Sequence, residues 1–453
     1  MGAPYVAHTD AEIAGMLASL GLASLEDLFE TVPAAIRLAG GLDLPDQWSE
    51  ADLLARLDDV AAMNRAVGRD FVCFAGAGAY DHEVPAVVKA LAGRSEFVTA
   101  YTPYQPEVAQ GILQALFEYQ TLVARLSGLE VANASLYDGA ASLVEAVNLA
   151  VAATGHQRIM CSAGVNPRWR RTMATFSRGT HHEVEYVPLA AGVTAWPTSP
   201  GSPAGEKAGA VVVATPNYLG CLEDLAAARR YADGLGAKLI VCMDPVAAGV
   251  LRTPGSFGAD VAVGEGQALG QALNFGGPYL GLFACQLADV RRLPGRLVGE
   301  TVDTEGRLAY VTTLRAREQD IRRDKASSNV CTNQTLMAVT AAIQLGWLGT
   351  QGLQEIAVRS ARAARYARES LVAIDGVELA AEAPVLREFA VRAPVPATVL
   401  IERLAEEGYL AGVAVGEGYE GTEYEGALLV ATTERRTRQE IDGYAAAFDK
   451  AIR

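Results

Sequence analysis

The sequence predicts an α/β protein whose large domain is built around a mostly parallel, doubly wound sheet. From about residue 70 onward, short apolar runs typical of buried strands alternate with amphipathic helical stretches. The chain has 453 residues, which is too long for one small core. Half of the residues are hydrophobic and a fifth are charged, which is typical of folded α/β proteins and not of disordered or fibrous ones.

Residues 1–65 are predicted to form a helical N-terminal arm. Thr9 and Glu12 make a capping box in front of apolar residues at helical spacing. Ser49 and Asp52 precede a second amphipathic run in the same way. We therefore expect helices in this segment and not the beginning of a sheet.

Residues 66–325 are predicted to form the large domain. Helical stretches over 140–153 and 221–235 separate several strand candidates, and this alternation is typical of a parallel sheet covered on both faces. A Pro/Gly/Ser-rich surface loop is expected over residues 194–209. The strand candidates are the runs "FVCF" from 71, "RIMCS" from 158, "VEYV" from 184, "AVVVA" from 210, "KLIVCM" from 238 and "DVAV" from 260.

Residues 326–453 are predicted to form a small α+β domain, in which two long helical stretches precede short strands at 388–392 and 428–432 and a closing helix. A helical arm, a large sheet domain and a small α+β domain are the layout of the fold-type I pyridoxal-phosphate enzymes. Layout alone is a weak indicator of function. Such an enzyme also needs a phosphate-binding turn, an acid for the pyridine nitrogen and a Schiff-base lysine.

Bulk properties exclude several classes of partner. The formal charge of -15 and the pI near 4.9 argue against nucleic acid, whose partners usually carry a basic surface. The first residues lack the features of a secretion signal, and no segment has the roughly 18 consecutive apolar residues of a membrane span. The six cysteines stand singly, without metal-ligand spacing. We expect a cytoplasmic protein with no metal and no membrane partner.

Two positions fit parts of a cofactor site. Gly139 opens a predicted helix whose free N–H groups are suited to a phosphate, although an ordinary capped helix explains the same residues. Asp244 follows the strand candidate at 238, at the sheet edge where ligands bind in such folds. A carboxylate there keeps a pyridine nitrogen protonated. A helix cap or an Asp-Pro turn is the alternative.

The lysine of such a site is missing. It is expected just after the strand candidate at 260, where the sequence runs from Gly264 to Ala268 without one. The five lysines stand at positions 89, 207, 238, 325 and 450, and only Lys325 can be considered, with strain. Arginine stays protonated and cannot form the imine. The chain is therefore not expected to hold the cofactor covalently. A self-sufficient enzyme that uses Lys325 is the alternative.

Three runs carry a family resemblance that covers roughly residues 1–450: "FAGAGAYDHEVPAVVKAL", "TAYTPYQPE" and "RAREQDIRRDKASSNVCTNQTL". They resemble the glycine cleavage system P-protein, glycine dehydrogenase (decarboxylating), and "TAYTPYQPE" is highly specific. In that family the two related halves form one chain or two subunits, and this chain resembles the first, alpha-type half. The beta-type half carries His-Lys where Gln267 and Ala268 stand here. Asp320 departs from the histidine common in the family, so no role is carried over to it.

The resemblance implies an activity and partners. With a beta subunit, in a heterotetramer, the chain would decarboxylate glycine on pyridoxal phosphate. It would then pass the aminomethyl group to the lipoyl arm of H-protein. The cofactor would be bound through the beta subunit and not covalently by this chain. The alternative is a non-catalytic structural or regulatory partner of the lysine-bearing subunit.

Active sites of fold-type I dimers lie between subunits, so loops of this chain are expected to reach the partner's pocket. Hydroxyl groups suit a phosphate or the glycine carboxylate, although interface packing explains the tyrosines equally well. The predicted contributors are Thr99, Tyr101, Thr102, Tyr104, Tyr80 and His82. Gly139 and Asp244 are kept as vestigial cofactor-binding candidates. A basic run is expected either to face H-protein or to be a solvated helix face, and it contains Arg168, Arg170, Arg171 and Arg178.

Overall fold

The N-terminal residues form helices, as predicted. In the computed structural model, which describes residues 7–38, 42–197, 207–274 and 276–453, the first of two units spans Met1–Arg65. Its described part contains α1 (Asp10–Ser19) and α2 (Glu50–Ala62) and no strand. The capping box is present, since Thr9 N donates to Glu12 Oε2 at 2.7 Å and Glu12 N donates to Thr9 Oγ1 at 3.3 Å. Ser49 caps α2 through Asp52 N.

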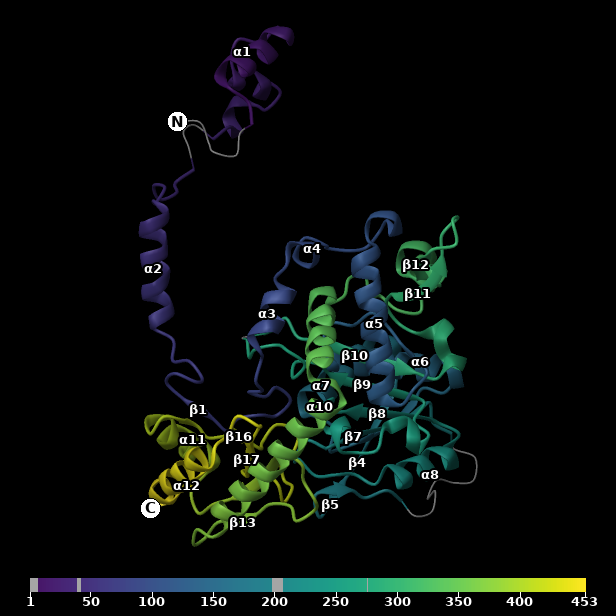
Figure 1. The fold of residues 1–453 in the computed structure, drawn as a ribbon, viewed down its shortest axis with the longest axis vertical. Helices are drawn as coiled ribbons and strands as arrows, with labels where there is room; N and C mark the ends of the chain where they lie inside the picture. The colour runs from purple at the N-terminus through teal and green to yellow at the C-terminus, as the bar shows by residue number, and fades with distance from the viewer. Residues whose placement is uncertain (1–6, 39–41, 198–206, 275) are drawn as a thin grey trace. The chain divides into compact units, whose positions relative to one another are not determined.

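The second unit, Ala66–Arg453, contains a seven-stranded sheet with the order β2-β10-β9-β8-β7-β3-β4. Figure 1 labels β10, β9, β8, β7 and β4 of this sheet. The strands from β9 to β4 in this order run parallel, whereas β10 is antiparallel to both β9 and β2. The mostly parallel sheet is thus confirmed. The strands are β2 (Val131–Ala132), β3 (Arg158–Ser162), β4 (Glu183–Val187), β7 (Ala210–Thr215), β8 (Lys238–Met243), β9 (Val261–Glu265) and β10 (Gly281–Cys285).

The apolar run "FVCF" is a strand, but it does not belong to this sheet. Val72–Cys73 forms β1, which pairs in parallel with β15 (Tyr409–Leu410) near the other end of the chain. Phe74, which follows β1, is fully buried and stacks on Tyr444 with 4.0 Å between ring centroids. The apolar character of the run predicted a strand, but the partner is set by this distant core.

Helices cover both faces of the large sheet. Successive strand residues point to opposite faces, so Val212 packs with α6 (Gly139–Thr154) and α7 (Pro167–Thr180), and Val211 packs with α8 (Leu225–Leu235). The face covered by α8 is extended by α5 (Gln110–Ser127) and by part of α10. The remaining elements of this region are α3 (Ala86–Ala92), α4 (Ser95–Val98), β5 (Leu189–Ala190), β6 (Val193–Thr194), β11 (Leu297–Val302), β12 (Leu308–Thr313) and α9 (Gln319–Arg322).

The C-terminal part combines long helices with a small antiparallel sheet, as predicted. The helix α10 (Thr335–Val372) is interrupted at Gly349, whose φ of 58° lies in the left-handed region. The small sheet has the order β13-β14-β17-β16. Its strands and flanking helices are β13 (Glu378–Leu379), β14 (Glu388–Arg392), β16 (Val413–Ala414), β17 (Leu428–Ala431), α11 (Ala397–Glu406) and α12 (Arg438–Ile452). The division between a large and a small domain at 325/326 stays a prediction.

Two absences hold for the described ranges. None of their helices is both long and apolar enough to cross a bilayer. They also contain no group of three or more His, Cys, Asp or Glu side chains arranged to hold a metal ion. Residues 198–206 of the expected surface loop over 194–209 lie outside these ranges.

Replacement of Phe74 tests the core that joins β1 to the C-terminal part. We expect Phe74→Ala to lower the free energy of unfolding by about 3–5 kcal/mol, because it leaves a cavity under the Tyr444 ring. Phe176→Ala is the matched control, since that ring is 54% exposed on α7. Urea unfolding followed by circular dichroism measures both. Equal effects of the two substitutions would contradict this account.

Candidate functional site

A cavity of about 90 Å³ lies at the carboxyl ends of β7, β8 and β9. Ligands of doubly wound folds bind at this edge of the sheet. The cavity is smaller than the roughly 300–1,000 Å³ typical of sites for cofactor-sized ligands. Its walls include the aromatic residues Tyr80, Trp169 and Tyr218 and the charged residues Asp244, Glu265, Arg387 and Glu388.

Asp244 stands where the sequence predicts the cofactor acid, but its carboxylate already has a cationic partner. Its Oδ2 atom lies 2.6 Å from Arg387 Nη2, and the Arg387 side chain is only 4% exposed. The other oxygen, Oδ1, accepts a hydrogen bond from Val246 N at 2.9 Å, so the residue also makes the expected Asp-Pro turn. Arg387 comes from the residue before β14 of the small sheet. The ion pair therefore links the two sheets.

Gly139 begins α6, where the sequence predicts a phosphate-binding turn. Its N–H group, however, already donates a hydrogen bond to a glutamate side chain. Asp138 caps the helix by accepting from Ala141 N at 2.7 Å. Gly139 N donates to Glu265 Oε2 at 3.0 Å. The other oxygen, Oε1, accepts from Gln267 N and Leu280 N, both at 3.0 Å. The N–H groups of Gly139 and Ala141 in the first turn of α6 are therefore already bound by carboxylates of the protein.

The two positions matched to His-Lys have structural partners. The Gln267 side chain accepts from Tyr80 N at 2.9 Å and donates to Tyr80 O at 3.1 Å. It also donates to Gln271 O at 2.8 Å. Ala268 is buried against Val246 and other apolar residues. Gln267 thus holds the loop that carries Tyr80 beside the cavity.

None of the five lysines lines the cavity, within the described residues. Lys238 binds Asp260 at 3.0 Å and Asp289 at 2.9 Å at the first residue of β8, which is the opposite edge of the sheet. Lys325 is exposed in a short helix of residues 323–325. The structure therefore gives no support to a self-sufficient enzyme that uses Lys325.

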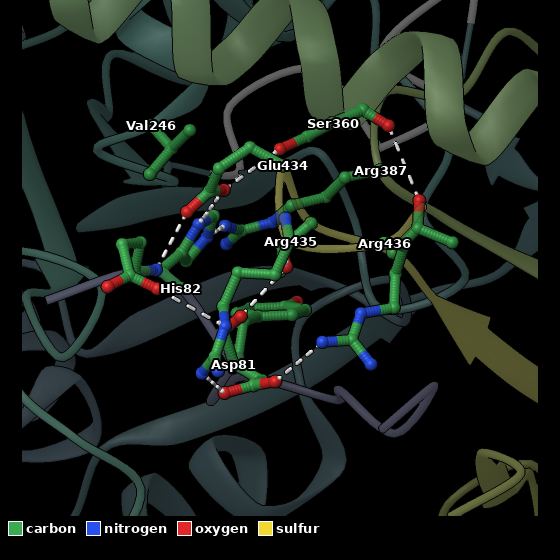
Figure 2. A network of polar contacts seen from close by, with 12 residues as sticks. Asp81, His82, Val246, Ser360, Arg387, Glu434, Arg435 and Arg436 are labelled. Carbon is green, nitrogen blue, oxygen red and sulfur yellow. Dashed lines mark hydrogen bonds and ion pairs between the residues drawn. The ribbon is translucent and has the colours of Figure 1, made fainter. Parts of the chain in front are cut away.

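Tyr80 and His82 both bind the guanidinium of Arg387. Arg387 Cζ lies 3.5 Å from the centroid of the Tyr80 ring, a cation–π contact. Arg387 Nη1 donates to His82 Nε2, and His82 Nδ1 lies 2.6 Å from Glu434 Oε2 (Figure 2). Because a guanidinium only donates, His82 Nε2 carries no proton, and the Nδ1 proton points to Glu434. Tyr80 lines the cavity. His82 is not a lining residue and contacts the cavity only through Arg387.

A second part of the network in Figure 2 ties the same loop to the C-terminal part. Asp81 binds Arg435 Nη1 at 2.5 Å and Arg436 Nη2 at 3.1 Å, and its carbonyl oxygen accepts from Thr433 Oγ1 at 2.8 Å. Both arginines and Glu434 belong to the segment between β17 and α12. Asp81 and His82 are both buried, so the loop of residues 77–82 is held by ion pairs on one side and by Gln267 on the other.

The predicted loop residues lie elsewhere. Thr99, Tyr101, Thr102 and Tyr104 line a separate depression of about 600 Å³, and none of them lines the cavity at Asp244 in the described structure. Tyr101 is 73% exposed and Tyr104 is 61% exposed. Arg296 Cζ lies 5.8 Å from the centroid of the Tyr104 ring, and Thr99 Oγ1 donates to Ser95 O at 2.6 Å. The predicted set is therefore split into an internal group and a surface group.

The basic run on α7 does not form one uniform face. Arg170 is buried, donates to Gly418 O at 3.1 Å and lies against the rings of Tyr186 and Tyr419. Arg171 binds Glu417 at 2.5 Å on the surface. Arg168 and Arg178 are exposed. Only three of the four arginines are thus available to a partner.

Sequence reasoning missed Glu265, Arg387 and Glu388, which line the cavity, and Glu434, which binds His82. Glu388 Oε2 accepts from Tyr80 Oη at 2.8 Å, and Glu388 Oε1 accepts from Ala77 N at 2.7 Å. The available signal was the charged pair Arg387 and Glu388 at the start of an apolar strand, because such charges are rarely buried without a partner.

Burial changes the ionisation of the carboxyl groups around the cavity. It raises the pKa of Glu265 to about 7, against the opposing effect of hydrogen bonds from backbone N–H groups. It raises the pKa of Glu388 to about 7 as well, against hydrogen bonds from Ala77 N and Tyr80. For Glu434, burial also acts to raise the pKa, but the hydrogen bond with His82 and other contacts bring the pKa below its ordinary value.

Comparison with known proteins gives one family. Residues 3–448 match the family described as the glycine cleavage system P-protein. The probable glycine dehydrogenase (decarboxylating) subunit 1 of Moorella thermoacetica is 46% identical over 443 residues, which is 98% of each chain. The protein of the same name from Nitratidesulfovibrio vulgaris is 44% identical over 438 residues, which is 97% of each chain.

Solved structures agree with this. The crystal structure of a glycine decarboxylase (P-protein) of the glycine cleavage system, in inhibitor-bound form, has a TM-score of 0.92 and 44% identity and covers 99% of this chain and 100% of that chain. The cysteine desulfurase CsdA of Escherichia coli has a TM-score of 0.60 at 15% identity over 87% of this chain and 98% of that chain, a likeness of fold alone. The predicted fold class, that of the fold-type I pyridoxal-phosphate enzymes, is confirmed.

The raised pKa of Glu388 predicts a pH effect on stability. Between the ordinary pKa of 4.5 and the folded-state value of about 7, the unfolded chain loses a proton that the folded chain keeps. The free energy of unfolding therefore falls as the pH rises through this window, by on the order of 3 kcal/mol for this group. Glu388→Gln should remove this contribution, which urea unfolding at several pH values would measure. An unchanged pH dependence in the variant would contradict the assignment.

Proposed function

Because the chain belongs to the glycine cleavage system P-protein family, we propose that it is the first, alpha-type subunit of a two-chain glycine decarboxylase. The observation that carries this proposal is the similarity over 98% of both chains to a relative named glycine dehydrogenase (decarboxylating) subunit 1. In this function the assembled enzyme decarboxylates glycine and passes the aminomethyl group to the lipoyl arm of H-protein. When bound, pyridoxal phosphate supplies the electron sink for the decarboxylation.

The residues around the cavity of this chain do not fit that cofactor. No lysine lines the cavity in the described structure, and Ala268 stands at the matched position. Asp244 is paired with Arg387, and Gly139 N is bound to Glu265. We therefore assign the cofactor to a beta subunit that carries the lysine, and this chain to a role that does not require covalent attachment.

The surface group is the part of this chain that we assign to the shared site. Tyr101 and Tyr104 present large, exposed rings beside a depression of about 600 Å³. Tyrosine combines an apolar ring with a hydroxyl group, so it suits an interface that also binds a polar ligand. Arg296 lies against the Tyr104 ring and donates to Asn333 Oδ1 and Cys331 O, both at 3.1 Å. These contacts hold the loop in place before a partner binds.

Thr99 and Thr102 complete this loop, and their role in the proposal is to bind or orient a phosphate or a carboxylate in the partner's pocket. Tyr80 and His82 act as positioning residues within this chain, because both bind Arg387. The exposed arginines of α7, with Arg168 among them, are the proposed contact for H-protein, because clustered positive charge attracts an acidic partner.

The remaining assignments concern assembly and location. We expect equal numbers of alpha and beta subunits in a heterotetramer. A cytoplasmic location agrees with the cysteines, since five are buried, Cys331 is exposed and all six are free. The reducing conditions of the cytoplasm keep such cysteines as thiols.

Substitution of the loop tyrosines tests the shared site. In the complex reconstituted with the beta subunit and H-protein, we expect Tyr101→Phe and Tyr104→Phe to lower the glycine decarboxylation rate by about 10- to 100-fold, which is the loss of one hydrogen bond to a charged ligand. Tyr186→Phe is the control, because this tyrosine is 45% exposed on β4. The rate of glycine-dependent carbon dioxide exchange measures the effect.

Complex formation is measured in parallel by size-exclusion chromatography. The proposal requires that both loop variants still assemble with the beta subunit while the rate falls. Turnover that stays unchanged in both variants would favour the alternative, a structural or regulatory partner that adds nothing to the pocket. The chain without its partner should have no exchange activity.

A further inference from the structure

The cavity at Asp244 lies where the fold class binds cofactors, but the groups that would bind a phosphate and a pyridine ring are engaged within the chain. It lies at the carboxyl ends of β7, β8 and β9, beside the N-terminus of α6. The fold class places cofactors at this edge of the sheet. In this chain, however, two side chains from outside the cofactor-binding turn already satisfy the two charged positions.

We infer that the cavity is occupied by the protein's own side chains, with Glu265 in place of a cofactor phosphate and Arg387 in place of a protonated pyridine ring. The inference rests on the fold class and on the contacts within this chain. It does not require the proposed function to be correct. It adds to that function a reason why the chain holds its shape without a bound cofactor.

Glu265 fills the anion position. Its two oxygens accept from three backbone N–H groups, those of Gly139, Gln267 and Leu280, all at 3.0 Å. A phosphate at the N-terminus of α6 would need the first of these N–H groups. The ring of Trp169 also lies against Gly139, so close that a Cβ atom on this residue would overlap the ring. A phosphate at this position would therefore have to compete with Glu265 for the N–H group of Gly139.

Arg387 fills the cation position. Its guanidinium lies 2.6 Å from Asp244 Oδ2, where a protonated ring nitrogen would otherwise neutralise the acid. It also lies against the Tyr80 ring, with 3.5 Å between Cζ and the ring centroid. His82 accepts from the same guanidinium. A planar cation is thus held between an acid and an aromatic ring, as a cofactor ring would be.

These two groups also hold the surrounding loops. Glu265 joins α6 to the residues after β9 and before β10, and Arg387 joins the small sheet to Asp244 and to the loop that carries Tyr80 and His82. In an enzyme that binds its cofactor reversibly, the cofactor would make such connections only when bound. In this chain the side chains of Glu265 and Arg387 make these connections themselves.

The first test uses the full wild-type chain without its partner. We expect pyridoxal 5′-phosphate, pyridoxal and inorganic phosphate to leave its melting temperature unchanged. Pyridoxal 5′-phosphate should also produce no saturable change in its absorbance band when added to this chain. Saturable binding of pyridoxal 5′-phosphate that protects residues of the cavity in hydrogen exchange would overturn the inference.

The second test opens the anion position. In Glu265→Ala, three buried N–H groups lose their acceptor, so the variant should melt at a lower temperature in buffer without phosphate. Inorganic phosphate at about 10 mM should raise this melting temperature by roughly 2 °C or more. Pyridoxal 5′-phosphate should do the same, and pyridoxal, which lacks the phosphate, should not.

Glu265→Gln is the matched control, because it keeps the volume of the side chain and one of its two acceptor oxygens and should leave the site closed to phosphate. If Glu265→Ala does not fold, Glu265→Ser serves instead, since it shortens the side chain but keeps a hydroxyl. Equal phosphate responses of wild type, Glu265→Gln and the shortened variant would overturn the assignment of Glu265.

The third test opens the cation position in the same background. Glu265→Ala combined with Arg387→Met frees Asp244 and the space over Tyr80. We expect this double variant to bind pyridoxal 5′-phosphate at least about tenfold more tightly than Glu265→Ala alone, a factor that corresponds to one favourable ion pair. No gain in affinity in a folded double variant would overturn the assignment of Arg387. Activity of the reconstituted complex is a separate readout, so the proposed function can fail while this inference stands.

Discussion

The ion pair between Asp244 and Arg387 is the contact on which the site depends. Asp244 follows β8 of the large sheet and Arg387 precedes β14 of the small sheet, so the pair joins the two sheets at the ligand-binding edge. Because both side chains are largely buried, each charge is stable only in the presence of the other. Tyr80, His82 and, through His82, Glu434 all orient around the same guanidinium. One interaction thus couples the cavity to the C-terminal part.

Because the groups around the cavity are engaged within the chain, the surface loop with Tyr101 and Tyr104 is the better candidate for contact with a partner. The internal group, Tyr80 and His82, is committed to contacts within the chain, whereas Tyr101 and Tyr104 expose most of their side chains to solvent. Large exposed aromatic rings beside a depression are typical of a surface that another protein covers. This contrast supports the proposal that the chain serves catalysis through its surface loop, while its own cavity has a structural role.

The candidate site was only partly predictable from the sequence. Asp244 and Gly139 were found because the end of a buried strand and the start of a helix are local features, and the cavity does lie between them. Glu265 and Arg387 were not found, because nothing in their neighbourhoods along the chain indicates that they would meet these two residues. The missing lysine was visible at once, since its absence is a property of composition and position.

The sequence by itself determined the helices and strands, the mostly parallel sheet, the family and the fact that no lysine stands between Lys238 and Lys325. Each of these follows from local periodicity, capping or residue type, which act over a few neighbouring residues. Only the tertiary structure decided that β1 pairs with β15, that Glu265 binds Gly139 and that Arg387 binds Asp244. These contacts join segments far apart in the chain, and their formation depends on how whole sheets pack, which no local pattern encodes.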